Sequence, residues 1–160
     1  MYMNMCMYLH TRPTSARPSK KYSCKNTRMT TTVALRGVGG ADLSMPLVGL
    51  GTWRMGNASE TRAAVGLALS IGYRALDCAL GYNNQEGVGA AVAASGMARD
   101  QLWITSKIPG GLNTSATTEA LERSIAQLGV GYVDLMLLHY PASWSGVGGP
   151  SMRKEAWLAM

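Results

Sequence analysis

From about residue 30 onward, the chain alternates short apolar runs with segments of helical periodicity. This strand–helix alternation occurs four times, and the last apolar run, Tyr132–Leu138, is almost continuous. An apolar run without polar alternation is typical of a strand buried on both faces, as in parallel sheets. Strands that alternate with helices indicate an α/β fold with parallel strands. Doubly wound sheets and barrels share this rhythm, so the pattern alone does not choose between them.

Local start and stop residues predict where the individual elements lie. Asn57 with Glu60 three positions later is typical of a helix start, and Gly72 is a helix stop. Two β-prone runs separated by a glycine-rich turn at residues 36–40 predict a hairpin leading into a strand. The expected strands are Thr30–Leu35, Met45–Leu50, Ala75–Ala79, Leu102–Ser106 and Tyr132–Leu138, and the expected helices follow Asn57, span Gln85–Ser95 and Thr117–Leu128, and begin at Glu155.

Composition excludes several classes of protein. The chain has 160 residues, of which 47% are hydrophobic and 15% charged, so a fully disordered chain is excluded and one folded domain is expected. No stretch reaches the roughly 18 apolar residues that a membrane-spanning helix needs. The three cysteines Cys6, Cys24 and Cys78 show neither a CxxC nor a Cys/His pattern, so no disulfide framework and no metal site are predicted.

The net charge of +6 is unevenly distributed. Residues 1–41 carry seven Lys and Arg and no acid, whereas residues 42–160 carry eight bases and nine acids. A basic nucleic-acid surface on the folded body is therefore not expected. Residues 1–28 are interpreted either as a basic leader, disordered or similar to a transit peptide, or as untranslated sequence read in frame, with Met29 as the true start. The leader is expected to pack on nothing, and the location is cytoplasmic, or organellar if the leader is a transit peptide.

Four side chains with proton-transfer chemistry are expected at one edge of the sheet. Asp77, Lys107 and His139 each lie at the carboxyl end of a predicted strand, and Tyr82 lies in the loop just beyond the second of these strands. In parallel α/β folds the carboxyl ends share one face, and that face holds the active site. Taken singly, each residue has a structural interpretation, such as a helix cap for Asp77 or a core histidine for His139.

Together the four residue types suit the reduction of a carbonyl group. A tyrosine hydroxyl has a reference pKa of about 10, which is too high for a good proton donor at neutral pH. A nearby ammonium such as Lys107 lowers that pKa, and Asp77 can hold the ammonium in place. His139 can hydrogen-bond the substrate oxygen or pass the proton. Hydride must come from a cofactor, because no side chain supplies one.

The motifs that surround these residues resemble those of the aldo-keto reductases. The segment 45–53 looks like the first barrel strand of that family, and 72–79 with Tyr82 and 84–89 resembles its signature. The segments 103–107 and 132–141 are similar to its third and fourth strands. The resemblance covers about residues 31–160 and consists of several motifs in order at family-like spacing.

The resemblance implies a (β/α)₈ barrel, of which residues 29–160 would form the amino-terminal half with about four βα units. It implies reduction of aldehydes or ketones with NADPH, a catalytic tetrad of Asp77, Tyr82, Lys107 and His139, and Tyr82 as the general acid. It places the nicotinamide near Gly51, Thr52 and Trp53. The residues that it assigns to substrate binding are Trp53, Tyr82 and His139.

The chain departs from the family in length. A (β/α)₈ barrel takes about 250 residues, and in the family most groups that hold the cofactor come from the second half. We expect a half barrel to expose two strand edges, to self-associate through them, and to reduce aldehydes poorly without the missing half. The alternative function is a non-catalytic half-barrel scaffold or interaction protein.

Overall fold

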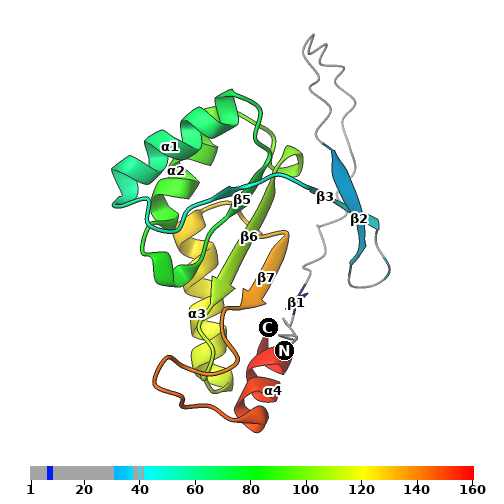
Figure 1. Cartoon of the computed structure of the whole chain (residues 1–160), viewed down its shortest axis with the longest axis vertical. Coiled ribbons are helices and arrows are strands. Elements are labelled where there is room, and N and C mark those ends of the chain that lie inside the picture. Colours follow the sequence, from blue (N-terminus) through cyan, green and yellow to red (C-terminus); the bar gives the residue numbers. More distant parts are fainter. Residues whose placement is uncertain (1–6, 9–30, 38–39, 41) are drawn as a thin grey trace.

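The computed structural model of the chain describes residues 7–8, 31–37, 40 and 42–160. Its centre is a sheet in the order β1-β7-β6-β5-β4, in which β4 (Leu50–Gly51), β5 (Ala75–Asp77), β6 (Trp103–Ile108) and β7 (Leu135–Leu138) run parallel. Three helices follow these strands in turn: α1 (Ala58–Ser70), α2 (Gln85–Ser95) and α3 (Thr114–Leu128). They cover one face of the sheet (Figure 1). The predicted α/β class is confirmed.

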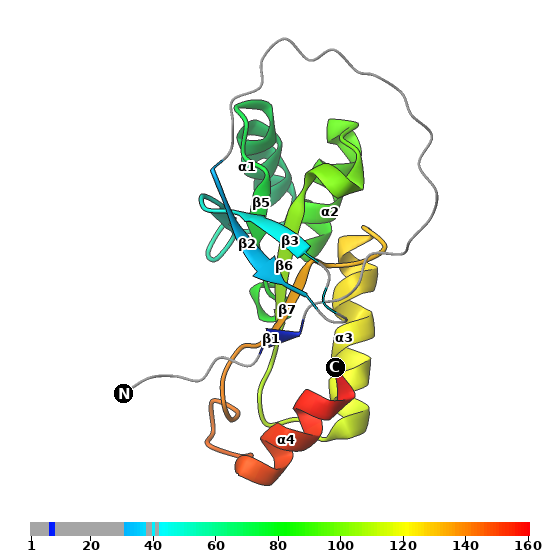
Figure 2. The same cartoon turned by 90° about the vertical axis from the view of Figure 1, so that its right-hand side faces the viewer.

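A hairpin covers the other face of the sheet. β2 (Thr32–Arg36) pairs antiparallel with β3 (Asp42–Pro46), and Figure 2 shows both strands in front of the sheet, with the helices behind it. Leu35, Leu43 and Met45 of the hairpin pack on a small core made by alternate sheet residues, which are Ala75, Trp103, Leu135 and Leu137. The intervening residues face the helices and form the main core.

Buried runs and side-chain caps explain most element boundaries. All four residues of β7 are buried, as its apolar sequence predicts. The side chain of Asn57 accepts hydrogen bonds from the backbone N–H groups of Ser59 and Glu60 and begins α1, and α2 ends at Gly96 with positive φ. Two short 3₁₀ turns, η2 (Leu80–Tyr82) and η3 (Arg99–Gln101), precede α2 and β6 respectively.

Several predicted boundaries were wrong. The second hairpin strand is Asp42–Pro46 instead of Met45–Leu50, because its register with β2 pairs Arg36 with Asp42 and Thr32 with Pro46. Helix α3 begins three residues early because Asn113 caps it. Helix α4 (Pro150–Ala159) begins five residues before Glu155, since proline suits the first helical position.

The expectation that residues 1–28 pack on nothing was wrong at one point. β1 (Met7–Tyr8) pairs antiparallel with β7, opposite Leu137 and Met136. The edge of β7 offers unpaired backbone N–H and C=O groups, and any extended segment can satisfy them. This edge is therefore occupied instead of exposed. The rest of the leader lies outside the described residues.

Asp134, just before β7, forms a structural ion pair. The guanidinium of Arg99 lies 2.7 Å from an Asp134 carboxylate oxygen, which also accepts the backbone N–H of Ile104. Arg99 in addition donates to the carbonyl of Tyr132 and lies over its ring. The cluster ties the start of β6 to the start of β7.

Helix α2 approaches both neighbours at glycines. A Cβ on Gly87 would overlap the carbonyl oxygen of Ala58 in α1, and one on Gly89 would overlap that of Leu128 in α3. Glycine at these two positions lets three helices pack closely behind the sheet.

We expect Gly87→Ala to lower the free energy of unfolding by about 1–3 kcal/mol, because the backbone of α1 would have to move. The matched control is Gly66→Ala, in α1, where an added Cβ meets nothing within 4 Å. It should raise the free energy of unfolding by about 0.5–1 kcal/mol through better helix propensity. Urea titration followed by circular dichroism measures both changes, and equal effects would contradict the close-packing argument.

Candidate active site

Lys107 lies near the carboxyl end of β6 and joins three groups of the neighbouring segment. Its ammonium donates to a carboxylate oxygen of Asp77, to the backbone carbonyl of Cys78 at 3.1 Å, and to the hydroxyl of Tyr82 at 3.3 Å. The lysine side chain is 12% exposed and the aspartate side chain 47%. The ion pair therefore sits at the margin of the fold, with Lys107 inside and Asp77 half open to solvent.

The ring of Tyr82 lies between two other rings. Trp53 approaches it with ring centroids 4.8 Å apart, and His139 approaches it edge-on at 5.6 Å. His139 stacks on Tyr140 at 4.4 Å, and Tyr140 in turn contacts Trp144. These five residues form a continuous surface that we call the aromatic wall, and Trp53 and Trp144 at its two ends are 59% and 86% exposed.

The sheet brings these residues together, as their strand-end positions predicted. Asp77 is the last residue of β5 and pairs with Thr105 of β6. Lys107 lies two positions beyond Thr105. The backbone N–H of His139 donates to the carbonyl of Ile108 at 2.8 Å, which continues the pairing of β6 and β7. Tyr82 ends the 3₁₀ turn η2, directly above the end of β5. The four side chains thus share one edge, to which the strand arrows in Figure 1 point.

His139 is held in its neutral form. Burial lowers the pKa of His139 below its ordinary value of 6.5, and the positive charge of Lys107 lowers it further, while Asp77 opposes both effects. A neutral imidazole carries one N–H donor and one acceptor nitrogen. The histidine can therefore donate a hydrogen bond to an uncharged oxygen at neutral pH.

Cys78, next to Asp77, is a packing residue. It is fully buried, and its thiol donates to the carbonyl oxygen of Thr105 at 2.9 Å. Burial raises the pKa of Cys78 to about 12. The thiolate needed for redox or nucleophilic chemistry is therefore disfavoured.

The residues that the sequence assigned to cofactor contact differ in access. Gly51 and Trp53 are exposed, and a Cβ on Gly51 would meet nothing within 4 Å. Thr52 is fully buried, and its N–H and hydroxyl both donate to the backbone carbonyl of Asp77. Its carbonyl accepts from the side chain of Asn84. Contact with a ligand remains a prediction for Gly51, Thr52 and Trp53, and Thr52 in addition connects the end of β4 to Asp77 and Asn84.

Sequence reasoning missed three residues of the site. Tyr140 and Trp144 extend the aromatic wall, and the only available clue was an aromatic residue directly after His139. Asn84 stands directly before α2, and nothing in the sequence indicated its bond to Thr52. Ser106, which precedes Lys107 in the chain, forms a buried hydrogen-bonded group with Gln85 and Ser124 that joins α2 and α3 to β6.

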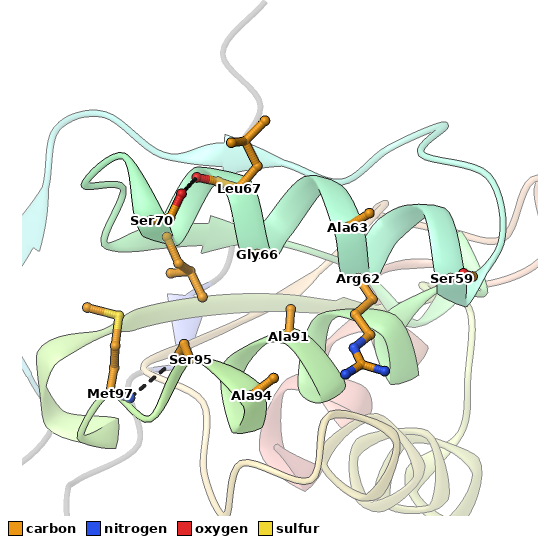
Figure 3. Close-up of a pocket in the computed structure, with 11 residues that line it drawn as sticks. Ser59, Arg62, Ala63, Gly66, Leu67, Ser70, Ala91, Ala94, Ser95 and Met97 are labelled. Atoms are coloured by element: carbon orange, nitrogen blue, oxygen red, sulfur yellow. Dashed lines mark hydrogen bonds between the residues drawn. The ribbon is translucent and has the colours of Figure 1, made fainter.

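The structure also contains a groove between α1 and α2, of about 580 Å³ (Figure 3). Small side chains such as Ala63, Ala91 and Ala94 line it together with Arg62 and Met97. None of the four residues at the sheet edge belongs to its lining. The groove is thus a separate feature of the outer helical layer, and the chemistry is concentrated at the carboxyl edge of the sheet.

Two further observations concern the described part of the chain. Within it, no helix is both long and apolar enough to cross a membrane. No group of three or more His, Cys, Asp or Glu side chains is placed there so that it could hold a metal ion.

The chain thus has parallel strands with helices on one face, and an Asp–Lys–Tyr–His cluster lies at the carboxyl ends of these strands. The sequence model of the aldo/keto reductase family matches residues 47–160. The chain belongs to the aldo/keto reductase family.

Relatives and solved structures agree with this assignment. A 9,11-endoperoxide prostaglandin H2 reductase of Trypanosoma cruzi is 42% identical over 98 residues, which are 61% of this chain and 35% of the relative. A glyoxal reductase of Bacillus subtilis is 38% identical over 121 residues, or 74% of this chain and 41% of the relative.

Among solved structures, an aldo/keto reductase of Brucella melitensis superimposes with a TM-score of 0.69 at 33% identity, over 82% of this chain and 47% of that one. An aldo-keto reductase of Bombyx mori in complex with NADP gives a TM-score of 0.66 at 31% identity, over 80% and 45%. The chain thus spans less than half the length of the relatives it matches, and its parallel sheet corresponds to part of their barrel.

The charges around His139 predict opposite effects of two substitutions. Lys107→Met removes a positive charge and should raise the pKa of His139, whereas Asp77→Asn removes a negative charge and should lower it further. An NMR pH titration of the imidazole signals measures both. A shift in the same direction for both variants would contradict the assignment of these charges.

The same residue gives stability a pH dependence of known sign. Because the pKa of folded His139 lies below its ordinary value, the unfolded chain binds more protons as the pH falls through about 6.5. The contribution of His139 to the free energy of unfolding is complete above this pH and declines below it. In His139→Gln, the free energy of unfolding should decline less on acidification. Urea titrations between about pH 5 and 8, which bracket the ordinary histidine pKa, measure this change.

Proposed function

We propose that this chain contributes the catalytic half of an NADPH-dependent reductase that converts aldehydes or ketones to alcohols, with Tyr82 as the proton donor. The observation that carries the proposal is the position of the Lys107 ammonium. It lies 3.3 Å from the hydroxyl oxygen of Tyr82 while Asp77 holds it from the other side. A cation at this distance stabilises the negative charge that forms on a phenol when it gives up its proton.

Each residue of the cluster has a role in this proposal. A substrate carbonyl oxygen lies between the hydroxyl of Tyr82 and the imidazole of His139, and neutral His139 donates a hydrogen bond that orients it. Tyr82 then transfers its proton to that oxygen, and Lys107 stabilises the resulting phenolate. Asp77 orients Lys107. A nicotinamide held beside Trp53 and Gly51 would supply the hydride, because no side chain can.

The residues present fit one part of the cofactor. The exposed ring of Trp53 beside Tyr82, and the open space at Gly51, can receive a planar ring next to the reacting carbonyl. The NADP complex of the Bombyx mori relative supports NADP(H) as the cofactor. Assignment of NADPH over NADH to this chain is part of the proposal.

We further propose small carbonyl compounds as the substrate class. Several relatives carry the names glyoxal reductase and methylglyoxal reductase, among them those of Bacillus subtilis and Salmonella typhimurium. The aromatic wall gives such a substrate an apolar surface and one hydrogen-bonding edge at Tyr82 and His139. Self-association of the chain remains part of the proposal at the outer edge of β4, which pairs with no strand of the described part of the chain, whereas β1 occupies the edge of β7.

Two preparations test the function: the 160-residue chain alone, and the chain joined to the carboxyl-terminal half of the Brucella melitensis relative. We expect NADPH-dependent reduction of methylglyoxal by the joined protein and little by the chain alone. Holding the hydride donor in place can lower the activation free energy by as much as about 7–11 kcal/mol, and the chain alone lacks most of that contribution. NADPH absorbance reports the rate. No activity in a folded joined protein would favour the non-catalytic scaffold.

Within the joined protein, Tyr82→Phe should lower kcat by about 100-fold or more, because the proton donor is lost while the ring remains. Tyr73→Phe is the matched control, since Tyr73 lies before β5 and outside the cluster. This variant should leave kcat unchanged within about twofold, because Tyr73 contacts none of the four residues of the cluster. Full activity of Tyr82→Phe would refute the assignment of the acid.

A further inference from the structure

Three helices of the chain begin directly after an asparagine, and one of these asparagines behaves differently. The side chain of Asn57 accepts hydrogen bonds from the first turn of α1, and that of Asn113 accepts one from the N–H of Ala116 in α3. Asn84 occupies the same position before α2 and makes no side-chain capping bond. An asparagine cap ordinarily stabilises a helix, so the side chain of Asn84 is used for something else.

The side chain of Asn84 turns away from α2 and toward the end of β4. It is 2% exposed, and its Nδ2 donates to the backbone carbonyl of Thr52 at 2.9 Å. Its Oδ1 has no hydrogen-bond partner among the described residues. Both the lost cap and the buried unpaired oxygen lower stability, so the bond to Thr52 is not explained by stability alone.

The bond joins the segments that carry the two adjoining rings of the site. Thr52 donates its N–H and its hydroxyl to the carbonyl of Asp77, at 2.9 and 3.2 Å. Trp53 follows Thr52 directly, and Tyr82 precedes Asn84 by two residues across Asn83, whose φ is +55°. Asn84 thereby ties the backbone before Trp53 to the loop that holds Tyr82, where the two ring centroids lie 4.8 Å apart.

We propose that Asn84 is a positioning residue, which holds the ring of Trp53 against that of Tyr82 by fixing the carbonyl of Thr52. Its effect on turnover rests on the proposed function, whereas its effect on the ring geometry does not. The residue acts through Thr52 and touches no reacting atom. A shift of the ring pair by a fraction of an ångström would misplace both the proton donor and the surface on which the carbonyl compound lies.

The substitution Asn84→Ser separates this role from helix capping. Serine is as good a cap as asparagine, but its short side chain cannot reach the carbonyl of Thr52. The matched control is Asn113→Ser, the same change at an asparagine whose side chain does cap its helix. Asn84→Asp is a second variant, of equal size, that lacks the Nδ2 donor.

The first measurement uses the 160-residue chain and requires no turnover. Fluorine NMR of 5-fluorotryptophan, with Trp53 assigned from Trp53→Phe, and carbon-detected tyrosine signals report the ring pair. We expect the Trp53 and Tyr82 signals to shift in Asn84→Ser and Asn84→Asp and to remain unchanged in Asn113→Ser. Unchanged ring signals in folded Asn84→Ser, or unfolding of both Asn84 variants by thermal denaturation, would overturn the proposal.

The second measurement uses the joined protein described above. Asn84→Ser should lower kcat about tenfold or more while the melting temperature stays close to that of Asn113→Ser, since misplacement by about 1 Å costs up to about 100-fold. If the Trp53 and Tyr82 signals do not shift in Asn84→Ser and its kcat is normal, Asn84 is not a positioning residue. If the joined protein without any substitution reduces no aldehyde, while Asn84→Ser still shifts the Trp53 and Tyr82 signals, the positioning role stands and the proposed function is refuted.

Discussion

The pairing of the Lys107 ammonium with the Asp77 carboxylate is the interaction on which the site depends. It requires parallel pairing of β5 and β6 in one register, because a shift by one residue would turn Lys107 to the other face of the sheet. Asp77 is half exposed, so solvent screens the attraction and the pair adds little to stability. What it determines is position: the cation is held within reach of the Tyr82 hydroxyl instead of extending into solvent.

The surroundings of this pair show how the fold supports chemistry at some cost to local stability. Asn84 gives up the capping role that Asn57 and Asn113 perform for their helices. His139 is kept neutral by burial and by the neighbouring cation. Cys78 beside them is made inert by complete burial. Asn84 thus departs from the most stable local arrangement beside the carboxyl ends of the strands, where the candidate site lies.

The rest of the molecule keeps that edge in place. Helices α1, α2 and α3 pack behind the sheet through close backbone contacts at Gly87 and Gly89, and the β2–β3 hairpin covers the opposite face. The sheet is therefore buried on both sides, although the chain spans less than half the length of its aldo/keto reductase relatives. Both cores are made by alternate residues of the same strands, so the strands that carry Asp77 and Lys107 are anchored from two directions.

The sequence by itself determined the α/β class, three of the helix ends, and the placing of Asp77, Tyr82, Lys107 and His139 at one edge. Each of these follows from local periodicity or from the rule that parallel strands share their carboxyl ends. It did not determine the pairing of Met7–Tyr8 with β7, the end of the hairpin at Pro46, or the bond between Asn84 and Thr52. These depend on groups far apart in the chain, whose hydrogen-bonding capacity is visible in sequence but whose partner is chosen only when the strands and helices pack. Asn84 and Asn113 both stand directly before a helix, and only the tertiary structure decided that Asn113 caps its helix while Asn84 reaches Thr52, because Thr52 at the end of β4 lies beside Asn84 in the folded chain.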